Sequence, residues 1–393
     1  MSEAEPIAVI GAGPAGLIAA ELLSAAGKRV VVYERMPSVA RKFLMAGRGG
    51  LNLTHAEPFE RFITRYGEAA DKLQPMLEAF TPNDLRAWAD ALGAETFIGS
   101  SGRVFPRAMK ASPLLRAWLS RLTHQGVEFR LRSTWLGWSE DGALRFAGDE
   151  PPVRAAATLL ALGGASWPRL GSDGSWREVL LERGVAVAPF RPANAGFNVA
   201  WSEHFRTRFA GQPLKTIALR CGDAEVRGEA MVTNYGLEGG VIYALSSELR
   251  ARVPVVVHID LRPALSADAI AAKLSKAKPG DTLSSTLRKT LGLAPVAIGL
   301  LHEAGPPPRA PDALAALIKS IPVALASSRG LDRAISTAGG VSWDAADDDL
   351  QLRAIPNVYV AGEMLAWEAP TGGYLLQACF ATGVWAARAM LRR

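Results

Sequence analysis

The stretch Ile7-Ala-Val-Ile-Gly11-Ala-Gly13-Pro-Ala-Gly16 decides the fold of this 393-residue chain. Its four apolar residues predict a short buried strand, and its glycines predict a tight turn into a helix over 17–26. The first glycine permits the bend, the second lets the backbone approach a pyrophosphate, and the third lets helix and strand pack closely. A second apolar run, 29–34, ends on an acid. The pattern predicts a βαβ unit that binds a dinucleotide.

The acid that ends this unit, Glu34, strengthens the prediction. It follows the glycines by about 20 residues, where a carboxylate can accept a ribose hydroxyl. The helix N-terminus offers free N–H groups and a positive dipole end to phosphates. The alternative interpretation is a glycine-rich turn that binds no ligand.

Composition narrows the class of protein. Length predicts two or three domains, and the chain is 49% hydrophobic and 21% charged. The net charge of +6 permits RNA as a partner, although no motif indicates it. Cys221 and Cys379 stand far apart, so neither a disulfide framework nor a metal site is expected. This composition favours a cytoplasmic protein.

Residues 8–27 are nearly all apolar, yet a membrane anchor is not expected. No basic residues precede the run, its glycines have turn spacing, and Glu21 interrupts it. No other stretch is long enough to span a bilayer. We therefore expect a soluble protein with no membrane partner.

Residues 36–55 form a predicted glycine-rich loop that follows the ribose-binding strand. Backbone N–H groups in such a loop can form a concavity for anions. Three cations in it, Arg41, Lys42 and Arg48, could neutralise phosphate. A flexible surface loop is the alternative.

The remaining chain predicts further elements of an α/β fold. Helical spacing runs through 57–93, and a helix begins at Ser112. Short strands are expected at 96–105, 127–131, 133–138 and 144–146, and a buried strand over 155–162 ends in Gly163-Gly164.

A change of pattern at Pro189 predicts an inserted domain. Strand-like runs separated by turns fill 194–261, which indicates an antiparallel sheet or small barrel. Helical patterns follow over 264–329. We place the boundaries at 1–190 with 335–393 for the first domain and 191–334 for the insert, divided into 191–263 (barrel-like) and 264–334 (mostly helical).

The C-terminal stretch returns to α/β chemistry. A strand from Asn357 ends in Gly362-Glu363, and Thr371-Gly-Gly-Tyr374 opens a helix over 375–391. A helix N-terminus with two glycines is again suited to an anion or a carbonyl.

This order of strand ends resembles FAD flavoproteins of the glutathione-reductase-like class. There the N-terminal unit binds ADP and the late Gly-acid pair holds the ribityl chain. More narrowly, the chain resembles the YhiN/BaiN-like (aminoacetone-oxidase-like) family. The matching motifs are Arg41-Lys42 with Asn52-Leu-Thr54, Gly102-Arg-Val-Phe-Pro106, Gly163-Gly-Ala-Ser166 with Pro168 and Gly171-Ser172, Gly228-Glu229, Thr233-Asn-Tyr-Gly-Leu237, Gly339-Gly-Val341, Gly362-Glu363, and Thr371-Gly-Gly-Tyr374 with Gln377.

The resemblance implies an FAD-binding Rossmann-like domain split by an inserted antiparallel β-barrel-like domain and a small helical subdomain. The chain departs from the family pattern at four positions. Leu51 stands where the family commonly has Cys, Ala366 and Leu375 replace Asp and Asn, and Asn234 replaces His. We therefore expect a divergent branch that keeps FAD.

The residues expected to contact FAD come from all of these motifs. They are Gly11, Gly13, Pro14, Ala15, Gly16, Glu34, Arg35, Arg41, Lys42, Arg48, Gly49, Asn52, Trp135, Gly163, Gly164, Gly362, Glu363, Gly372, Gly373 and Tyr374. Three side chains are candidates for proton transfer: Tyr374, His55 and Glu368. Packing or a surface charge is the alternative role for each.

The predicted function is that of an FAD-dependent oxidoreductase that moves a hydride between flavin and a small organic substrate. No second G-x-G-x-x-G is present, so NAD(P)H, if it is the reductant, docks transiently. The resemblance allows three further interpretations: reduction of a conjugated C=C bond, oxidation of a small amine, and reduction of uridine in ribosomal RNA. A flavin-binding structural or sensor protein is the non-enzymatic alternative.

Overall fold

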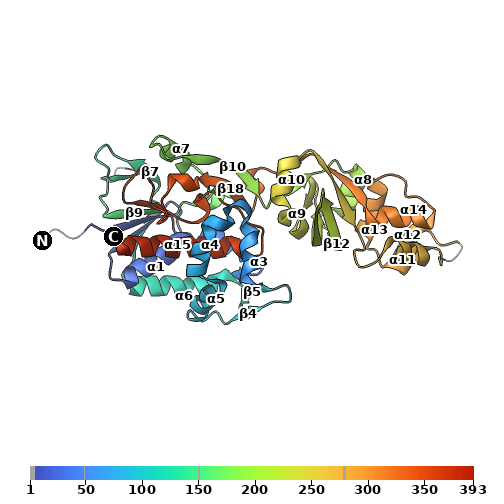
Figure 1. Ribbon diagram of the computed structural model, residues 1–393, viewed down its shortest axis with the longest axis horizontal. Helices are drawn as coiled ribbons and strands as arrows, with labels where there is room; N and C mark the ends of the chain where they lie inside the picture. Colours follow the sequence, from blue (N-terminus) through green and yellow to red (C-terminus); the bar gives the residue numbers. More distant parts are fainter. Residues whose placement is uncertain (1–4, 48, 149–150, 278–279) are drawn as a thin grey trace. The chain divides into compact units, whose positions relative to one another are not determined.

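The computed structural model describes residues 5–47, 49–148, 151–277 and 280–393. The chain divides into two compact units, one formed by 1–191 with 335–393 and the other by 192–334. In Figure 1 the blue and red ends of the chain belong to the first unit, and the yellow and orange middle forms the second. Each unit has its own hydrophobic core.

A five-stranded parallel sheet forms the centre of the first unit. Its strand order is β19-β9-β1-β2-β6. Every pair runs parallel, so the carboxyl ends of all five strands meet at one edge. The bounds are β1 (Ile7–Ile10), β2 (Val30–Glu34), β6 (Glu128–Leu131), β9 (Ala157–Leu160) and β19 (Val358–Val360).

Two helices pack together beside this sheet. Helix α1 (Pro14–Ala25) lies against α15 (Tyr374–Arg392), and Figure 1 shows the two side by side. Gly383 makes the close approach possible, because a Cβ there would lie 2.4 Å from the carbonyl oxygen of Ala15. Contact between the two helices brings the last segment of the chain against the first.

A buried carboxylate joins α1 to its neighbours α5 (Pro82–Asp90) and α6 (Ala111–His124). Glu21 accepts hydrogen bonds from the indoles of Trp88 at 3.0 Å and Trp118 at 2.6 Å. Arg121 pairs with the same carboxylate at 2.9 Å. The residue that interrupts the apolar run 8–27 is therefore a structural anchor.

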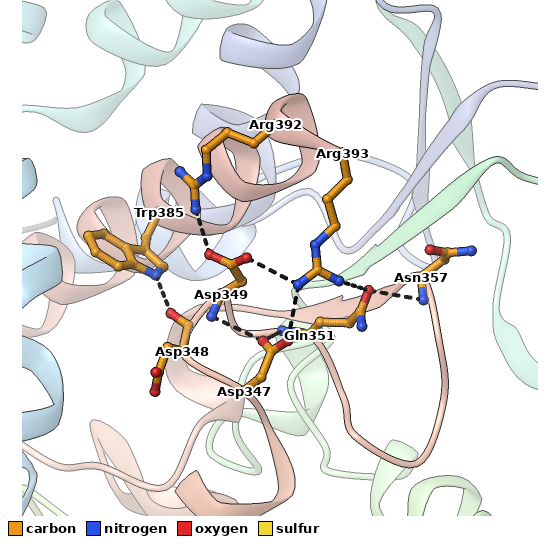
Figure 2. A network of polar contacts seen from close by, with 8 residues as sticks. All are labelled: Asp347, Asp348, Asp349, Gln351, Asn357, Trp385, Arg392 and Arg393. Atoms are coloured by element: carbon orange, nitrogen blue, oxygen red, sulfur yellow. Dashed lines mark hydrogen bonds and ion pairs between the residues drawn. The ribbon is translucent and has the colours of Figure 1, made fainter.

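The end of α15 is held by an acidic loop, shown in Figure 2. Arg392 pairs with Asp349 at 2.5 Å, and Arg393 reaches Asp347 at 3.2 Å and Asp349 at 3.1 Å. The Trp385 indole donates to the backbone oxygen of Asp348 at 2.7 Å. These contacts tie the last helix to the chain that leads into β19.

The prediction that residues 36–55 form a loop was wrong in part. Residues Arg41–Ala46 form helix α2, and Thr54–His55 form β3, which pairs with β5 (Arg103–Pro106). The sequence gives little indication of α2, because the residue before it, Ala40, has a left-handed backbone conformation and no side chain caps the helix. Further α-helices and strands of this unit are α3 (Phe59–Ile63), α4 (Ala70–Ala79), β4 (Thr96–Ile98), β7 (Trp135–Trp138), β8 (Leu144–Phe146), α7 (Trp176–Leu181) and β18 (Ser336–Val341), and β10 (Val187–Ala193) runs from this unit into the second.

The second unit contains a seven-stranded antiparallel sheet of order β16-β15-β12-β13-β14-β11-β17. The two outermost strands follow each other in the chain with one residue between them, so the sheet curves back on itself as a barrel does. Its strands are β11 (Phe197–Asn198), β12 (Pro213–Cys221), β13 (Ala224–Val232), β14 (Gly236–Glu238), β15 (Val255–Asp260), β16 (Ile321–Leu325) and β17 (Ser327–Ser328).

The expected split of this unit into a strand half and a helical half needs correction. Helices α8 (Glu203–Phe209), α9 (Gly240–Ala244) and α10 (Ser246–Arg252) interrupt the strand region. The helices α11 (Ala267–Leu274), α12 (Leu283–Leu291), α13 (Pro295–Glu303) and α14 (Pro311–Lys319) follow as expected. Strands β16 and β17 then return to the sheet, where alternate residues of β16 are buried.

The predicted fold class is confirmed: a parallel α/β sheet is interrupted by an antiparallel insertion. Among the helices that the structure describes, none is both long and apolar enough to cross a membrane.

Candidate functional site

A cleft opens at the carboxyl edge of the parallel sheet, where α/β proteins bind ligands. It contains about 1000 Å³ of unfilled space, its open mouth included. Twelve of the residues predicted to bind cofactor line it: Gly11, Gly13, Pro14, Ala15, Glu34, Arg35, Arg41, Lys42, Trp135, Gly163, Gly362 and Glu363.

The three glycines of the first turn have different roles. Gly11 has a φ of +105°, and a Cβ on it would lie 2.3 Å from the Ala161 carbonyl oxygen. Gly16 lets α1 pack on the turn, because its Cβ would lie 2.0 Å from the Gly11 oxygen. Gly13 instead lines the cleft, and a Cβ on it would meet nothing within 4 Å. No side chain caps α1, so its N–H groups are open to a ligand.

The Glu34 carboxylate is fixed at the end of β2. Its Oε2 accepts the backbone N–H of Ala12 at 3.0 Å, and its Oε1 accepts that of Met36 at 2.9 Å. Burial raises the pKa of Glu34, against the lowering effect of these two hydrogen bonds and of Arg35. Two acceptor positions of the carboxylate stay available for ribose hydroxyls.

Buried donors without partners line the same cleft. The Trp135 indole N–H and the Arg41 Nε–H have no hydrogen-bond partner in the part of the chain that the structure describes. Orphaned buried donors are uncommon in native proteins, and a bound ligand with acceptor atoms accounts for them. Phosphate and adenine nitrogens are such acceptors.

One cation of the cleft is already paired. Arg35 contacts Asp173 at 2.5 Å, and this hydrogen bond helps to lower the pKa of Asp173 against the effect of burial. Asp173 was missed in the sequence, although it follows the motif Gly171-Ser172 directly. Ser172, Trp176 and Cys379 also line the cleft and were not predicted as cofactor contacts.

The β19 end of the cleft carries an ion pair. Lys42 contacts Glu363 Oε2 at 2.6 Å and donates to Ser166 Oγ at 2.7 Å. The other oxygen of Glu363 accepts the backbone N–H of Thr337 at 3.1 Å. Gly362, with a φ of +81°, brings the backbone close to Ala15 of α1.

The three candidates for proton transfer are not among the residues that line this cleft. Tyr374 donates its hydroxyl to Glu57 at 2.5 Å and stacks on His55 with ring centroids 5.5 Å apart. Burial, then the Glu57 carboxylate, raises the pKa of Tyr374. Both ring nitrogens of His55 are bound, one to the Glu57 N–H at 3.1 Å and the other to the Ser101 carbonyl at 3.0 Å. Glu368 is half-buried.

Seven further predicted contacts do not line the cleft: Gly16, Gly49, Asn52, Gly164, Gly372, Gly373 and Tyr374. Gly164 packs against Thr337, and Gly373 lies on the backbone of Thr54, where added carbons would approach within 2.5 Å. The Oδ1 of Asn52 is buried without a partner among the described residues. Arg48 lies outside the described residues.

The cleft therefore has the features of a dinucleotide site: a glycine turn, an uncapped helix N-terminus, a ribose-side acid and unpaired donors. FAD fits this donor set, because its diphosphate and ring acceptors match the orphaned N–H groups. Such a site at the edge of a parallel sheet is typical of a dinucleotide-binding protein.

Comparison with known proteins identifies the family. The family described as "HI0933-like protein Rossmann domain" matches residues 5–389, and the chain belongs to it. The protein is an FAD-dependent oxidoreductase, as predicted.

Two relatives match over nearly their whole length. The 3-dehydro-bile acid delta(4,6)-reductase of Clostridium scindens is 27% identical, over 98% of this chain and 99% of its own. The ribosomal RNA dihydrouridine synthase of Escherichia coli is 24% identical, over 94% of each chain.

Solved structures agree in fold. A flavocytochrome c3 fumarate reductase aligns with a TM-score of 0.53 and 16% identity, over 100% of this chain and 78% of its own. The 3-ketosteroid delta1-dehydrogenase of Sterolibacterium denitrificans aligns with a TM-score of 0.50 and 12% identity, over 100% of each chain.

Proposed function

We propose that the protein is an FAD-dependent reductase of carbon–carbon double bonds conjugated with a carbonyl, with NAD(P)H as electron donor. The names of the two full-length relatives support this substrate class. A 3-dehydro-delta(4,6) bile acid is a conjugated dienone, and dihydrouridine arises by reduction of the uracil 5,6 bond beside a carbonyl. The observation that carries the proposal is the cleft with Glu34 at one end and Glu363 at the other.

In this proposal residues 1–190 with 335–393 form the FAD-binding domain. Gly11, Gly13 and the start of α1 hold the diphosphate, Glu34 takes the adenosine ribose, and Glu363 faces the ribityl chain. Arg41 supplies positive charge, whereas Arg35 and Lys42 line the cleft as members of ion pairs. Bound flavin would supply the hydride chemistry, and the chain supplies binding, orientation and electrostatics. The insert 191–334 serves substrate choice.

Tyr374 is the preferred proton donor of the three candidates. A tyrosine hydroxyl is protonated near neutral pH, and burial and the Glu57 carboxylate raise the pKa of Tyr374 further. The hydroxyl is bonded to Glu57, which Arg65 holds through contacts of 3.0 and 2.7 Å, so proton replacement could pass through Glu57. His55 is less suited, because both of its ring nitrogens are bound to backbone groups.

Anaerobic mixing with NADPH and with NADH tests the electron donor. We expect one of them to bleach the flavin absorbance of the purified protein. Bleaching by neither would contradict a nicotinamide-linked reductase and favour an oxidase or a sensor.

A panel of substrates then tests whether the enzyme reduces a conjugated carbon–carbon double bond. A pre-reduced enzyme should be reoxidised by cyclic enones and dienones, with saturation of the bond seen by mass spectrometry. Small amines test the oxidase alternative, in which oxidised enzyme is bleached by the amine without NAD(P)H. Reaction with amines alone would refute the proposal.

Uridine in ribosomal RNA is the second candidate substrate, favoured by the Escherichia coli relative. Most of the chain's excess positive charge lies in the insert, because residues 192–334 contain 17 Lys and Arg against 12 Asp and Glu. RNA binding through such charge falls steeply with salt. Absence of RNA binding at low salt would remove this candidate.

A further inference from the structure

The strongest unexplained feature of the cleft is the pair formed by Lys42 and Glu363. The two residues are 321 positions apart, one in α2 and the other in the short helix Gly362–Met364 that follows β19. Their side chains are 29% and 12% exposed, so the pair is largely withdrawn from water. Both line the cleft.

Each partner of the pair has a second anchor. Lys42 donates to Ser166 Oγ at 2.7 Å, and Glu363 accepts the Thr337 N–H at 3.1 Å. Thr337 is held in turn, because its hydroxyl accepts the Ala165 N–H at 2.8 Å. The position of the ammonium is therefore set by Ser166 after β9 and by Glu363 after β19, and Thr337, after the insert, anchors Glu363.

Among the described residues, the ammonium keeps one N–H for a ligand. Lysine has three donors, and two of them bond to Glu363 and Ser166. The carboxylate likewise keeps acceptor positions that could bind a hydroxyl. Together the two side chains present a donor and an acceptor to the cleft with no net charge.

Neutrality matters because a charge in a partly desolvated site acts strongly on its surroundings. Reduction of a flavin adds negative charge to it, so a lone cation nearby would favour reduction and a lone carboxylate would oppose it. In a balanced pair the two effects oppose each other, so the reduction potential depends on the presence of both partners.

We propose that Lys42 and Glu363 act as one neutral unit that sets FAD retention and the flavin reduction potential, with Glu363 as the positioning residue for Lys42. This inference rests on the proposed function, in which the flavin half of FAD lies at the β19 end of the cleft.

A double-mutant cycle tests the pair, with Lys42→Met, Glu363→Gln and both changes together. Two quantities are measured for each variant: the FAD dissociation constant, from fluorescence titration of the apoprotein, and the flavin midpoint potential. The matched control is Lys28→Met, which removes an exposed lysine just beyond the end of α1.

Each single variant should weaken FAD about tenfold, because each leaves one buried charge without its partner. The potential should fall in Lys42→Met, which leaves the carboxylate alone, and rise in Glu363→Gln, which leaves the cation alone. The double variant should return towards the wild-type potential and bind FAD no more weakly than either single variant. The control should change neither quantity.

Ser166→Ala provides a test without a change of charge, which also serves if a charge variant does not fold. It removes one anchor of Lys42, so FAD binding should weaken while the potential stays near that of wild type.

Three results would overturn the inference: equal potentials in all variants, strictly additive effects in the double variant, or a large loss of FAD in Lys42→Met with none in Glu363→Gln. The last would mean that Lys42 acts on phosphate alone. If the wild-type protein binds no FAD, the proposed function itself is wrong, and this result is distinct from a failure of the inference about Lys42 and Glu363.

Discussion

The backbone N–H of Ala12 donates to the Glu34 carboxylate at 3.0 Å, which ties the glycine turn after β1 to the acid that ends β2. The two residues are 22 positions apart. The same carboxylate also accepts the Met36 N–H, so its orientation is fixed before any ligand binds. Preorganisation of this kind lowers the cost of binding, because the acid needs no reordering when it meets a ribose.

Glu34→Gln should weaken FAD about tenfold, which corresponds to about 1.4 kcal/mol, because one charged acceptor for ribose is lost. FAD titration of the apoprotein measures this. Unchanged affinity would mean that Glu34 does not face the ribose.

The same variant has a predicted pH dependence. Burial raises the folded-state pKa of Glu34 above its usual 4.5. A carboxyl group with a raised pKa contributes stability that is present at low pH and lost as the pH rises through that pKa. The Tm of the wild-type apoprotein should therefore fall relative to that of Glu34→Gln as the pH rises above about 4.5 and through the raised pKa. A constant difference in Tm would contradict this.

Gly13→Val and Gly16→Ala should separate binding from folding. Gly13 has open space around it and faces the cleft, so its variant should fold normally and lose FAD. A methyl group on Gly16 would meet the Gly11 oxygen at 2.0 Å, so that variant should lose about 1–3 kcal/mol of stability. Urea unfolding and the yellow colour of the purified proteins measure the two effects. Full FAD content in Gly13→Val would refute the assignment of the turn.

Glu21→Leu should destabilise the protein by about 3–5 kcal/mol, because Arg121 and two indole N–H groups lose their common acceptor. Chemical denaturation measures the change. Glu178→Gln is the control, since its carboxylate is 71% exposed and pairs only with Arg177 among the described residues, so that pair is worth less than about 1 kcal/mol. Equal effects in the two variants would show that burial of Glu21 is unimportant.

Tyr374→Phe tests the proposed proton donor. It removes the hydroxyl that is bonded to Glu57 and leaves Arg65 in place, so FAD content should stay normal. If Tyr374 supplies the proton, kcat should fall by roughly 100-fold or more, the range expected for loss of a general acid. Flavin reduction by the nicotinamide should be unaffected. A variant with normal kcat would assign Tyr374 to packing alone.

Removal of the Tyr374 hydroxyl should also change how the stability of the folded protein depends on pH in the acid range. Burial alone would raise the pKa of Glu57, but hydrogen bonds from Arg65 and Tyr374 outweigh it and lower the pKa. A lowered carboxyl pKa gives stability that is present above the unfolded value and lost as the pH falls. Tyr374→Phe should therefore lose stability less steeply than wild type as the pH falls below about 5, and an identical acid profile would contradict this.

Much of the cofactor cleft could be predicted because its parts are local in sequence. Gly11, Gly13 and Glu34 lie on one βαβ unit, and their spacing alone predicts a dinucleotide site. Gly362-Glu363 could be assigned to the same edge because a parallel sheet brings its strand ends together. Asp173 could not be assigned, because its role depends on meeting Arg35 138 positions away.

The opening stretch by itself determined the βαβ unit, its glycine turn and the acid after the second strand. Those features follow from backbone sterics and from the periodicity of apolar residues, which act over a few neighbouring positions. Only the tertiary structure decided which charges face one another in the cleft. Lys42 meets Glu363, and Arg35 meets Asp173, because chain segments far apart in sequence close around one sheet edge. The energy of such pairs depends on burial and distance, which no local pattern specifies.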